Sequence, residues 1–347
     1  GEVRTMKDVR WGIAGCGKIS HDFTNALTFN KSNVVACAAR SETSSKRFAE
    51  TFGIPKHYGG YDGLLEDGEV DVVYIGTIHT THCELVMKAL DKGKHVLCEK
   101  PIGMNGREVR KMVALAKEKN LFLMEGMWTR CFPATRKIAS LLETGELGEV
   151  ITCTADLGFS IPFEVKRLYE LEMGGGGLLD LGVYPLAWLL LAFGDQELKS
   201  VNACASLHES GADMTGVITL RFGKEGVGSA SYSSRSETQK ELHINCTKGS
   251  IRVRGCWSSH TPERVEVRRD EAGEADVFEF PIEKNFPVPM NFGNSEGFVN
   301  ECRHVEECLR GGKLESNFWS LQETLKSHDI VDEIRKMLGV TYPQDQE

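Results

Sequence analysis

Short apolar runs alternate with amphipathic helical patterns over residues 9–126, and this alternation restricts the fold more than any other feature of the chain. Strand-like runs separated by helices form βαβ units, in which the helices cover both faces of a parallel sheet. The apolar runs lie at 9–15, 34–40, 71–77, 95–100 and 121–126, and the helical patterns lie at 18–29, 41–53, 81–93 and 106–120. The sequence therefore predicts an N-terminal α/β domain with a doubly wound parallel sheet.

The pattern changes after Met127. A helix is expected at 133–144, and the strands that follow alternate apolar and polar residues, with glycine-containing turns between several of them. These strands are expected at 150–159, 199–208, 215–222, 227–234, 241–247 and 250–255. A polar, proline-bearing stretch at 257–293 is expected to supply edge strands and a long loop, and two helices near 295–310 and 320–337 close the chain.

A chain of 347 residues is too long for one typical hydrophobic core. We expect a first domain at 6–128 and a second at 129–347, whose last helices can pack back on the first. Strands that follow one another without helices favour antiparallel pairing. The second domain is therefore predicted to be an α/β domain with a large, open, mainly antiparallel sheet.

Composition excludes several classes of protein. The net charge is −9 and the basic residues are scattered, so no basic stripe exists to bind nucleic acid. The 11 cysteines are odd in number and form no CxxC pair, which argues against a disulfide scaffold and a zinc site. No apolar run approaches about 18 residues and no signal-peptide core is evident. We expect a reduced, cytoplasmic protein with no membrane or nucleic-acid partner and no metal.

A glycine turn lies between the first strand and the first helix. Gly15 and Gly17 begin the sequence Gly-Cys-Gly-Lys-Ile-Ser, whose third small residue is Ser20. The first glycine permits a tight turn, and the second lets the backbone approach a pyrophosphate at the helix N-terminus, beside Lys18 and Ile19. A purely structural turn is the alternative. The place of the glycine turn at the start of a βαβ series favours a dinucleotide site of the Rossmann type.

The end of the second strand indicates which dinucleotide binds. Sites for NAD place an acidic residue there, whereas this strand ends in Arg40 and Ser41. A guanidinium and a hydroxyl can both bind a 2′-phosphate, which favours NADP. The alternative for Arg40 is a solvated surface arginine, and Ser41 or Thr43 is expected to cap the next helix.

The strand at 95–100 ends in Glu99, Lys100 and Pro101. Ligands of doubly wound sheets bind beyond the carboxyl ends of the strands, so this arrangement directs Lys100 toward the nicotinamide end of the site. Proline restricts the backbone and permits a cis bond at modest cost. We expect the Lys100–Pro101 bond to be cis.

A second unusual segment contains four consecutive glycines, at 174–177, followed by Asp180 and Tyr184 at the start of an apolar helix. The glycines either bring the backbone close to a ligand or another strand, or form a flexible turn. Residues four apart on a helix share one face, and a buried helix rarely carries a carboxylate and a phenol without partners. Asp180 is a catalytic candidate or a helix cap, and Tyr184 is a catalytic candidate or a core aromatic.

Several of these segments together resemble one family. The sequence is similar to the Gfo/Idh/MocA oxidoreductases, and within them to the dihydrodiol dehydrogenase branch, from about residue 9 to the C-terminus. The stretches that carry the resemblance are WGIAGCGKIS, GTIHTTH, CEKPIG and GGGGLLDLGVYPL, and those that carry the narrower one are LFLMEGMWTRCFPA and GVTYPQDQ. The resemblance implies a homodimer formed through the C-terminal sheet.

The resemblance also implies site residues. It makes Lys100 the catalytic lysine and Asp180 and Tyr184 the catalytic pair, with tyrosine where many members have histidine. It places the turn containing Thr77 and His79 along the dinucleotide. Glu99 is also expected to contact the dinucleotide. For His82 we favour a satisfied histidine at the helix start.

The chemistry expected of these residues is the oxidation of an alcohol. Tyr184 would exchange the proton, Lys100 would lower the pKa of that phenol and bind the substrate hydroxyl, and Asp180 would orient the pair. Trp128, and less strongly Phe159, would line the substrate pocket.

The resemblance implies NADP-dependent oxidation of a trans-dihydrodiol of an aromatic hydrocarbon, of a D-xylose-like aldose at C1, or of both. The alternatives are another sugar, sugar-phosphate or inositol dehydrogenase of the same superfamily, and a non-catalytic dinucleotide sensor. A phosphate-bearing substrate would require an additional basic cluster, for which Lys166 and Arg167 are the candidates.

Overall fold

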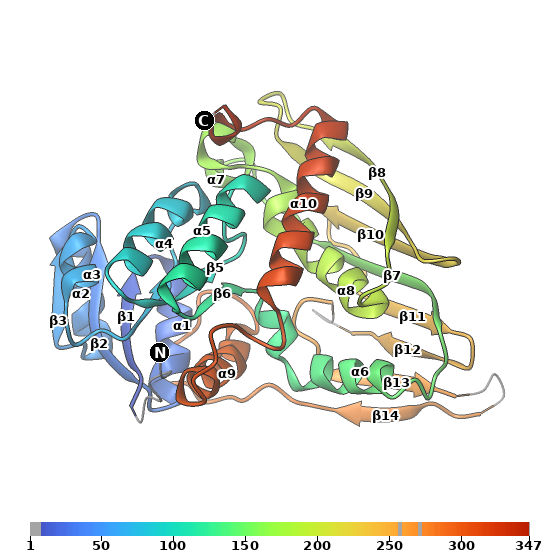
Figure 1. The fold of residues 1–347 in the computed structure, drawn as a ribbon, viewed down its shortest axis with the longest axis horizontal. Coiled ribbons are helices and arrows are strands. Elements are labelled where there is room, and N and C mark those ends of the chain that lie inside the picture. Colours follow the sequence, from blue (N-terminus) through green and yellow to red (C-terminus); the bar gives the residue numbers. More distant parts are fainter. Residues whose placement is uncertain (1–7, 256–258, 270–272, 347) are drawn as a thin grey trace. The chain divides into compact units, whose positions relative to one another are not determined.

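The computed structural model describes residues 8–255, 259–269 and 273–346, which form two compact units (Figure 1). The described part of the first unit comprises 8–131 and 282–324, and that of the second comprises 132–281 and 325–346. The expected domain start at residue 6 lies outside the described residues, as do positions 257–258 and 270–272 of the expected polar loop.

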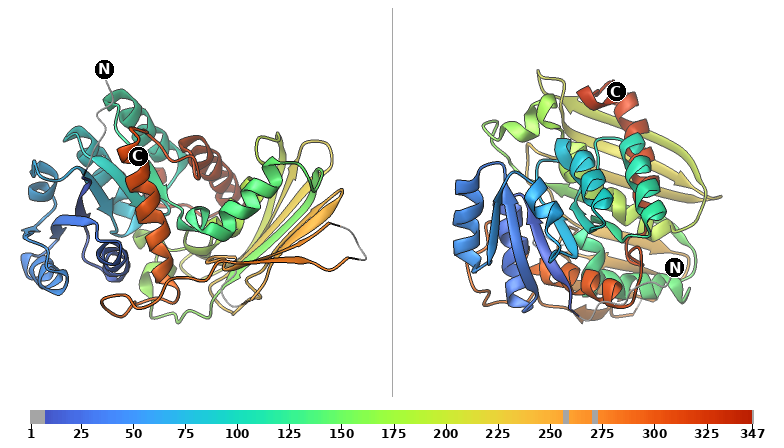
Figure 2. Two further views of the ribbon diagram at one scale, coloured as in Figure 1. Left: turned by 90° about the horizontal axis from the view of Figure 1, so that it is seen from below. Right: turned by 60° about the vertical axis from the view of Figure 1, so that its left-hand side comes forward.

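The first unit is built on a parallel sheet whose strands are drawn in blue to cyan (Figure 2). The sheet has six strands in the order β3-β2-β1-β4-β5-β6. The predicted parallel α/β sheet is therefore confirmed. Its strands and helices are β1 (Arg10–Ala14), α1 (Lys18–Phe29), β2 (Asn33–Ala39), α2 (Glu42–Phe52), β3 (Lys56–Gly59), α3 (Asp62–Glu66), β4 (Val72–Ile75), α4 (His82–Asp91), β5 (His95–Glu99), α5 (Gly106–Lys119) and β6 (Leu123–Gly126).

Two of these elements, β3 and α3, are absent from the sequence-based prediction. Strand β3 has the sequence Lys-His-Tyr-Gly and is nowhere fully buried, so no apolar run marks it. Helix α3 has five residues, which is too short to show a helical period. Strand β3 is held by its pairing with β2, and helix α3 packs against these two strands.

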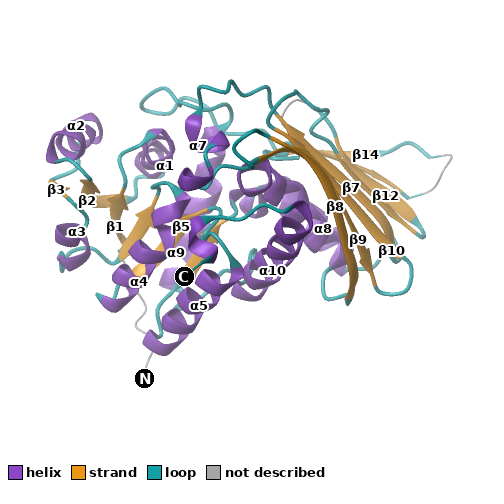
Figure 3. Cartoon of the chain, turned by 90° about the horizontal axis from the view of Figure 1, so that it is seen from above, coloured by secondary structure: helices purple, strands orange, loops and turns teal. Residues whose placement is uncertain are grey.

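Helices cover both faces of this sheet. Helices α1 and α2 lie on one face, and α4 and α5 lie on the other (Figure 3). Between α1 and the sheet, the ring of Phe23 stacks on Tyr74 at 3.8 Å, and Phe298 of α9 (Phe298–Arg310) contacts Phe23 edge-on at 5.6 Å. Such aromatic pairs bury large apolar areas and fix the helices on the sheet.

The segment 282–324 returns to the first unit through buried hydrogen bonds. The indole of Trp11 donates to Glu306 at 3.0 Å, and the indole of Trp319 donates to Glu125 at 2.8 Å. The expected division after residue 128 thus differs from the observed one, which falls after Cys131 and leaves 282–324 with the first unit. Helix α10 (Leu321–Leu338) begins in this segment and ends in the second unit.

The second unit contains an eight-stranded sheet with order β14-β13-β12-β11-β7-β10-β9-β8. Every neighbouring pair is antiparallel except β7 and β10, which are parallel, so the expected mainly antiparallel sheet is confirmed. Its elements are α6 (Pro133–Glu143), β7 (Val150–Gly158), α7 (Lys166–Tyr169), α8 (Val183–Phe193), β8 (Leu198–Leu207), β9 (Asp213–Phe222), β10 (Gly226–Ser233), β11 (Leu242–Cys246), β12 (Gly249–Val253), β13 (Arg264–Arg268) and β14 (Asp276–Glu279).

One face of this sheet packs against α8 and α6, and no described helix covers the other face (Figure 3). Along β9 the side chains alternate, with Ile218 and Leu220 buried and Val217 and Thr219 exposed. Helix α8 and the residues before it, Leu171–Phe193, are long and apolar enough to cross a membrane, but 89% of the most apolar window is buried inside the protein. That burial is typical of a core helix.

Candidate active site

The glycine turn connects β1 to α1 and packs against the end of β4. Gly15 has a φ of +99°, and a Cβ on it would lie 2.9 Å from the carbonyl oxygen of Gly76, so this position requires glycine. A Cβ on Gly17 would meet nothing within 4 Å, so the space at this residue is open. Ser20 is buried and its hydroxyl donates to the Gly76 carbonyl at 3.2 Å. The small third residue of the motif therefore packs the helix against the sheet, as expected.

The first turn of α1 is suited to an anion. Its N-cap residue is Gly17, no described side chain caps it, and its first turn carries no acidic residue. The first N–H groups of a helix have no intrahelical acceptor and carry a partial positive charge. Lys18 is exposed at the same end and Ile19 is half-buried.

Arg40 and Ser41 follow β2 directly. Arg40 is exposed, and its positive charge lowers the pKa of Tyr61, which burial raises more strongly. Ser41 is the N-cap of α2: its hydroxyl accepts from the backbone N–H of Ser44 at 3.3 Å and donates to the Ser44 hydroxyl at 2.8 Å. The cap interpretation of Ser41 is confirmed, and Arg40 is the basic side chain at this strand end.

The turn after β4 contains Thr77 and His79. The Thr77 hydroxyl is 2.8 Å from that of Thr81, and His79 is half-buried. His82 is buried at the start of α4, with its ring nitrogens 2.9 Å from the carbonyl of Pro101 and 3.1 Å from that of Thr77. Burial lowers the pKa of His82. The expectation of a satisfied histidine is confirmed, and His82 joins the turn after β4 to the turn after β5.

Lys100 comes directly after β5 and is half-buried, and the Lys100–Pro101 bond is cis, as predicted. Strands β2, β1, β4 and β5 are parallel neighbours in the sheet, so the residues that follow their carboxyl ends share one edge. These residues are Arg40, Gly15, Thr77 and Lys100.

The carboxyl group of Glu99 lies inside the first unit. The Tyr74 hydroxyl donates to it at 2.8 Å, and burial raises the pKa of Glu99 to about 7. Glu301 of α9 is also buried, and neither of its carboxyl oxygens has a hydrogen-bond partner among the described residues. Burial, followed by the charge of Glu99, raises the pKa of Glu301. Burial thus favours the neutral form of both carboxyl groups.

Trp128 begins the 3-10 turn Trp128–Cys131 and is 4% exposed. Its ring lies 4.3 Å from that of Phe298 in α9. The expected pocket residue is thus held by aromatic packing within the first unit.

In the second unit, two of the four consecutive glycines pack closely against neighbouring backbone. A Cβ on Gly175 would lie 2.8 Å from the backbone of Glu170, and one on Gly177 would lie 2.8 Å from the carbonyl of Met214 in β9. The backbone N–H of Leu178 donates to the buried Asp213 at 2.6 Å. The glycines therefore allow a close approach to a strand, in agreement with one of the two alternatives.

Asp180 lies in a π-helical turn, Leu178–Gly182, that leads into α8. Its carboxylate accepts from the Arg167 guanidinium at 3.2 Å, and the charge of Asp180 raises the pKa of Arg167. The N-cap positions of the π-turn and of α8 are Gly177 and Gly182, so Asp180 caps neither helix. The cap alternative is wrong, because the chain is already helical two residues before Asp180.

Tyr184 is the second residue of α8 and is 6% exposed. The ring of His260 lies 4.7 Å from its ring, at 89°. Phe159, just after β7, is half-buried; the Lys240 ammonium lies 4.4 Å above its ring, and His260 lies 6.3 Å away. The second unit thus brings the rings of Tyr184 and Phe159 near the same histidine.

Comparisons with known proteins identify the chain's family. The model of the oxidoreductase family with an NAD-binding Rossmann fold matches residues 9–127, and the Gfo/Idh/MocA C-terminal domain matches 135–252. The chain belongs to the Gfo/Idh/MocA oxidoreductases.

Relatives of this Gfo/Idh/MocA protein are similar over nearly their whole length. The human trans-1,2-dihydrobenzene-1,2-diol dehydrogenase is 40% identical, with 97% of this chain and 99% of the human protein covered, and the enzyme of that name from Bos taurus is 39% identical with the same coverage.

Among solved structures, a 3-ketoreductase from Actinomadura kijaniata in complex with NADP and TDP-benzene is 25% identical, with a TM-score of 0.79 and 95% and 98% of the two chains covered. A levoglucosan dehydrogenase in complex with NADH and levoglucosan, 20% identical with a TM-score of 0.81, shares the fold.

Two residues beside the expected catalytic pair of this Gfo/Idh/MocA oxidoreductase make contacts that local sequence patterns do not reveal. The sequence marks Arg167 only as a candidate phosphate ligand, whereas in the structure it forms an ion pair with Asp180. His260 lies in the polar stretch 257–293, where no periodicity places a residue beside Tyr184. Both contacts join residues far apart in the sequence. Among the described residues, no cluster of three or more His, Cys, Asp or Glu side chains has the arrangement of a metal site.

Proposed function

We propose that this protein oxidises a trans-dihydrodiol of an aromatic hydrocarbon, a D-xylose-like aldose at C1, or both, with transfer of a hydride to NADP⁺. The observation that carries this proposal is the identity of 39–40% to enzymes named trans-1,2-dihydrobenzene-1,2-diol dehydrogenase over 97% of the chain. The aldose activity is supported by structural neighbours that are sugar oxidoreductases, including one from Caulobacter crescentus named aldose-aldose oxidoreductase.

The first unit fits a dinucleotide with a 2′-phosphate. The uncapped N-terminus of α1 and the open space at Gly17 suit a pyrophosphate, and Lys18 adds a positive charge. Arg40, exposed after β2, suits the 2′-phosphate, because a guanidinium binds phosphate through paired hydrogen bonds. Thr77 and His79, in the turn after the adjacent β4, extend this edge along the ligand.

Bound NADP⁺ supplies the hydride acceptor. Tyr184 removes the proton of the substrate hydroxyl, and Lys100 stabilises the phenolate by its charge, because an unassisted phenol with a pKa of about 10 is a weak base at neutral pH. Asp180 orients this pair, and its ion pair with Arg167 keeps the carboxylate in place. Trp128 forms part of the wall of the substrate site.

The experiment that tests the proposal measures NADP⁺ reduction with dihydrodiols, pentoses, hexoses and inositols, in the wild type and in Tyr184→Phe. The variant keeps the ring and its contact with His260 but lacks the ionisable hydroxyl. We expect kcat to fall by about 100- to 10,000-fold while NADP⁺ affinity stays nearly constant.

Lys100→Met should give a similar loss, and the double variant should be little worse than either single one, because residues that act as a unit are non-additive. Tyr58→Phe, which removes a phenol bonded to Asp67 at 3.0 Å, is the matched control and should retain full activity. Wild-type turnover in Tyr184→Phe would refute the assignment and direct the search for a base to His79 or Asp180.

The alternative of a phosphate-bearing substrate is weakened by the contacts of the candidate basic pair. Arg167 is paired with Asp180 at 3.2 Å, and Lys166 with Glu170 at 3.5 Å. The substrate panel distinguishes this alternative from the proposed one, and an absence of turnover with all substrates would favour a dinucleotide sensor.

The proposal extends to assembly and location. The outer face of the second unit's sheet is uncovered by described helices and exposes Val217 and Val227, which supports a homodimer formed through this face. Sedimentation of the wild type and of Val217→Lys tests it, since the charge should dissociate the dimer. None of the ten described cysteines forms a disulfide with another described residue, and a reducing, cytoplasmic location agrees with that.

A further inference from the structure

Two cysteines meet at the glycine turn. Cys16 lies between Gly15 and Gly17 and is half-buried, whereas Cys37 is buried in the adjacent strand β2. Strands β1 and β2 are parallel neighbours, with Ala14 opposite Ala38, so the turn that follows β1 lies beside the end of β2.

The contacts of both sulfur atoms place the two thiols near each other. The Cys16 thiol donates to the carbonyl of Ala38, the residue after Cys37, at 3.5 Å. The Cys37 thiol contacts the carbonyl of Ser45 in α2 at 3.4 Å. The Cys16 thiol also interacts with the Cys37 sulfur, to which it can donate its single proton in place of the Ala38 carbonyl. The cysteine pair, Cys16 and Cys37, therefore connects the glycine turn to the strand that ends in Arg40.

We propose that Cys16 and Cys37 are an oxidation site, where a disulfide forms and weakens dinucleotide binding at the glycine turn. The site links two segments that bind opposite parts of the cofactor, the pyrophosphate and the 2′-phosphate. Its effect on binding rests on the proposed function, whereas the formation of the disulfide does not.

The pKa shifts of the two thiols indicate which sulfur reacts first with an oxidant. The hydrogen bond from Cys16 lowers the pKa of Cys37, against the opposing effect of burial, and the same bond raises the pKa of Cys16. The lower pKa favours Cys37 over Cys16 as the first sulfur to ionise, and thiolates are the nucleophiles in thiol oxidation. Because Cys37 is buried, the oxidant that fits is a small hydroperoxide such as hydrogen peroxide, not a bulky disulfide.

The reaction balances with that oxidant. The Cys37 thiolate attacks one peroxide oxygen, the O–O bond breaks, and Cys37 sulfenic acid and hydroxide form. The hydroxide takes the proton of the Cys16 thiol and leaves as water. The Cys16 thiolate then attacks the sulfur of the sulfenic acid, the S–O bond breaks, and the departing hydroxide takes up the proton that Cys37 first released. Two thiols and one hydrogen peroxide become a disulfide and two waters.

The disulfide affects binding through the backbone of the turn. It pulls Cys16 toward β2, and Cys16 lies between the two glycines that let the turn approach a phosphate. Loss of one N–H bond to a charged phosphate weakens affinity by about tenfold or more. By linkage, bound NADP⁺ disfavours the disulfide at equilibrium by the same factor.

The experiment uses full-length protein treated with hydrogen peroxide, then digested with trypsin and analysed by mass spectrometry without reduction. We expect a cross-link between peptides 11–18 and 32–40, which contain Cys16 and Cys37, and its loss on reduction. NADP⁺ titrations by fluorescence should show about tenfold or greater weakening after oxidation, restored by dithiothreitol. Cys37→Ala and Cys16→Ser should each abolish the peroxide effect, and the second substitution is at a half-buried position that tolerates change.

Cys204→Ser is the matched control, because Cys204 is exposed on β8 in the second unit, and this variant should respond to peroxide as the wild type does. Absence of the cross-linked peptides overturns the oxidation site. Equal NADP⁺ affinity in the reduced and disulfide forms overturns the switch alone. Reduced protein that binds no NADP⁺, while the cross-link still forms, contradicts the proposed function and not the oxidation site.

Discussion

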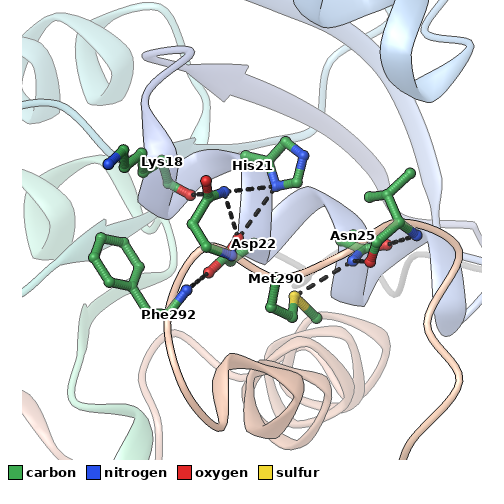
Figure 4. A network of polar contacts seen from close by, with 8 residues as sticks. Lys18, His21, Asp22, Asn25, Met290 and Phe292 are labelled. Carbon is green, nitrogen blue, oxygen red and sulfur yellow. Dashed lines mark hydrogen bonds and ion pairs between the residues drawn. The ribbon is translucent and has the colours of Figure 1, made fainter.

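Asp22 offers a direct test of how the segment 282–294 is held on the first unit. This carboxylate in α1 is fully buried and accepts three hydrogen bonds from Asn291 and Phe292 (Figure 4). The backbone N–H of Asn291 donates at 2.8 Å, the Asn291 amide at 2.8 Å, and the backbone N–H of Phe292 at 3.0 Å, while the His21 ring lies 3.1 Å away. One side chain thus joins residues that are about 270 positions apart in the sequence.

The cost of Asp22→Ala follows from these contacts. A hydrogen bond to a charged acceptor contributes about 1.5–3 kcal/mol. Asn291 and Phe292 are exposed, so water can replace part of what is lost, and we use the low end for the two backbone bonds. The expected loss is about 3 kcal/mol, which makes local opening of the segment about 100-fold more favourable.

The assay is hydrogen–deuterium exchange of peptides that cover residues 286–294. Asp22→Ala should accelerate exchange at Asn291 and Phe292 by about 100-fold. Asp22→Asn, which keeps one acceptor oxygen without the charge, should have an intermediate effect. Asn25→Ala should loosen Val288, because the Asn25 amide donates to the Val288 carbonyl at 2.6 Å and accepts from its N–H at 3.2 Å.

Asp91→Ala is the matched control, since Asp91 is an exposed carboxylate of the same unit, paired with Lys119 at 3.1 Å. It should leave the exchange of 286–294 unchanged, because exposed ion pairs contribute little. Wild-type protection of Asn291 and Phe292 in Asp22→Ala would refute the view that this carboxylate holds the segment.

Three further substitutions test the site. Arg40→Asp should weaken NADP⁺ binding by about tenfold or more and favour NAD⁺, and unchanged discrimination in fluorescence titrations would remove Arg40 from the cofactor site. Arg167→Met should lower kcat by about tenfold at constant NADP⁺ affinity, because Asp180 loses its ion-pair partner. Lys166→Met is the control, and equal kcat values in the two variants would exclude a role of Arg167 in positioning Asp180. Glu99 has a pKa of about 7 in the folded protein, above its usual 4.5, so its contribution to stability is complete below about pH 4.5 and is lost as pH rises through 7. The urea midpoints at about pH 5 and pH 8 should therefore differ less in Glu99→Gln than in the wild type, and an equal difference in both proteins would contradict that pKa.

The sequence by itself determined the elements whose signal is local. Helix α1 spans Lys18–Phe29 as expected, because apolar residues recur along one face and a glycine precedes them. The edge formed by Gly15, Arg40 and Lys100 was also predictable, since parallel strands in a doubly wound sheet present their carboxyl ends together.

Only the tertiary structure decided the contacts between distant segments. The return of 282–324 to the first unit depends on single side chains such as Trp319 and Glu125. In the second unit, β7 and β10 pair in parallel although they are about 75 residues apart in the sequence. The pairing of Arg167 with Asp180 and of Cys16 with Cys37 likewise has no periodic signature. Periodicity reports which face of an element is buried, but it carries no information about which distant residue meets that face, because that choice is made by the packing of the whole domain.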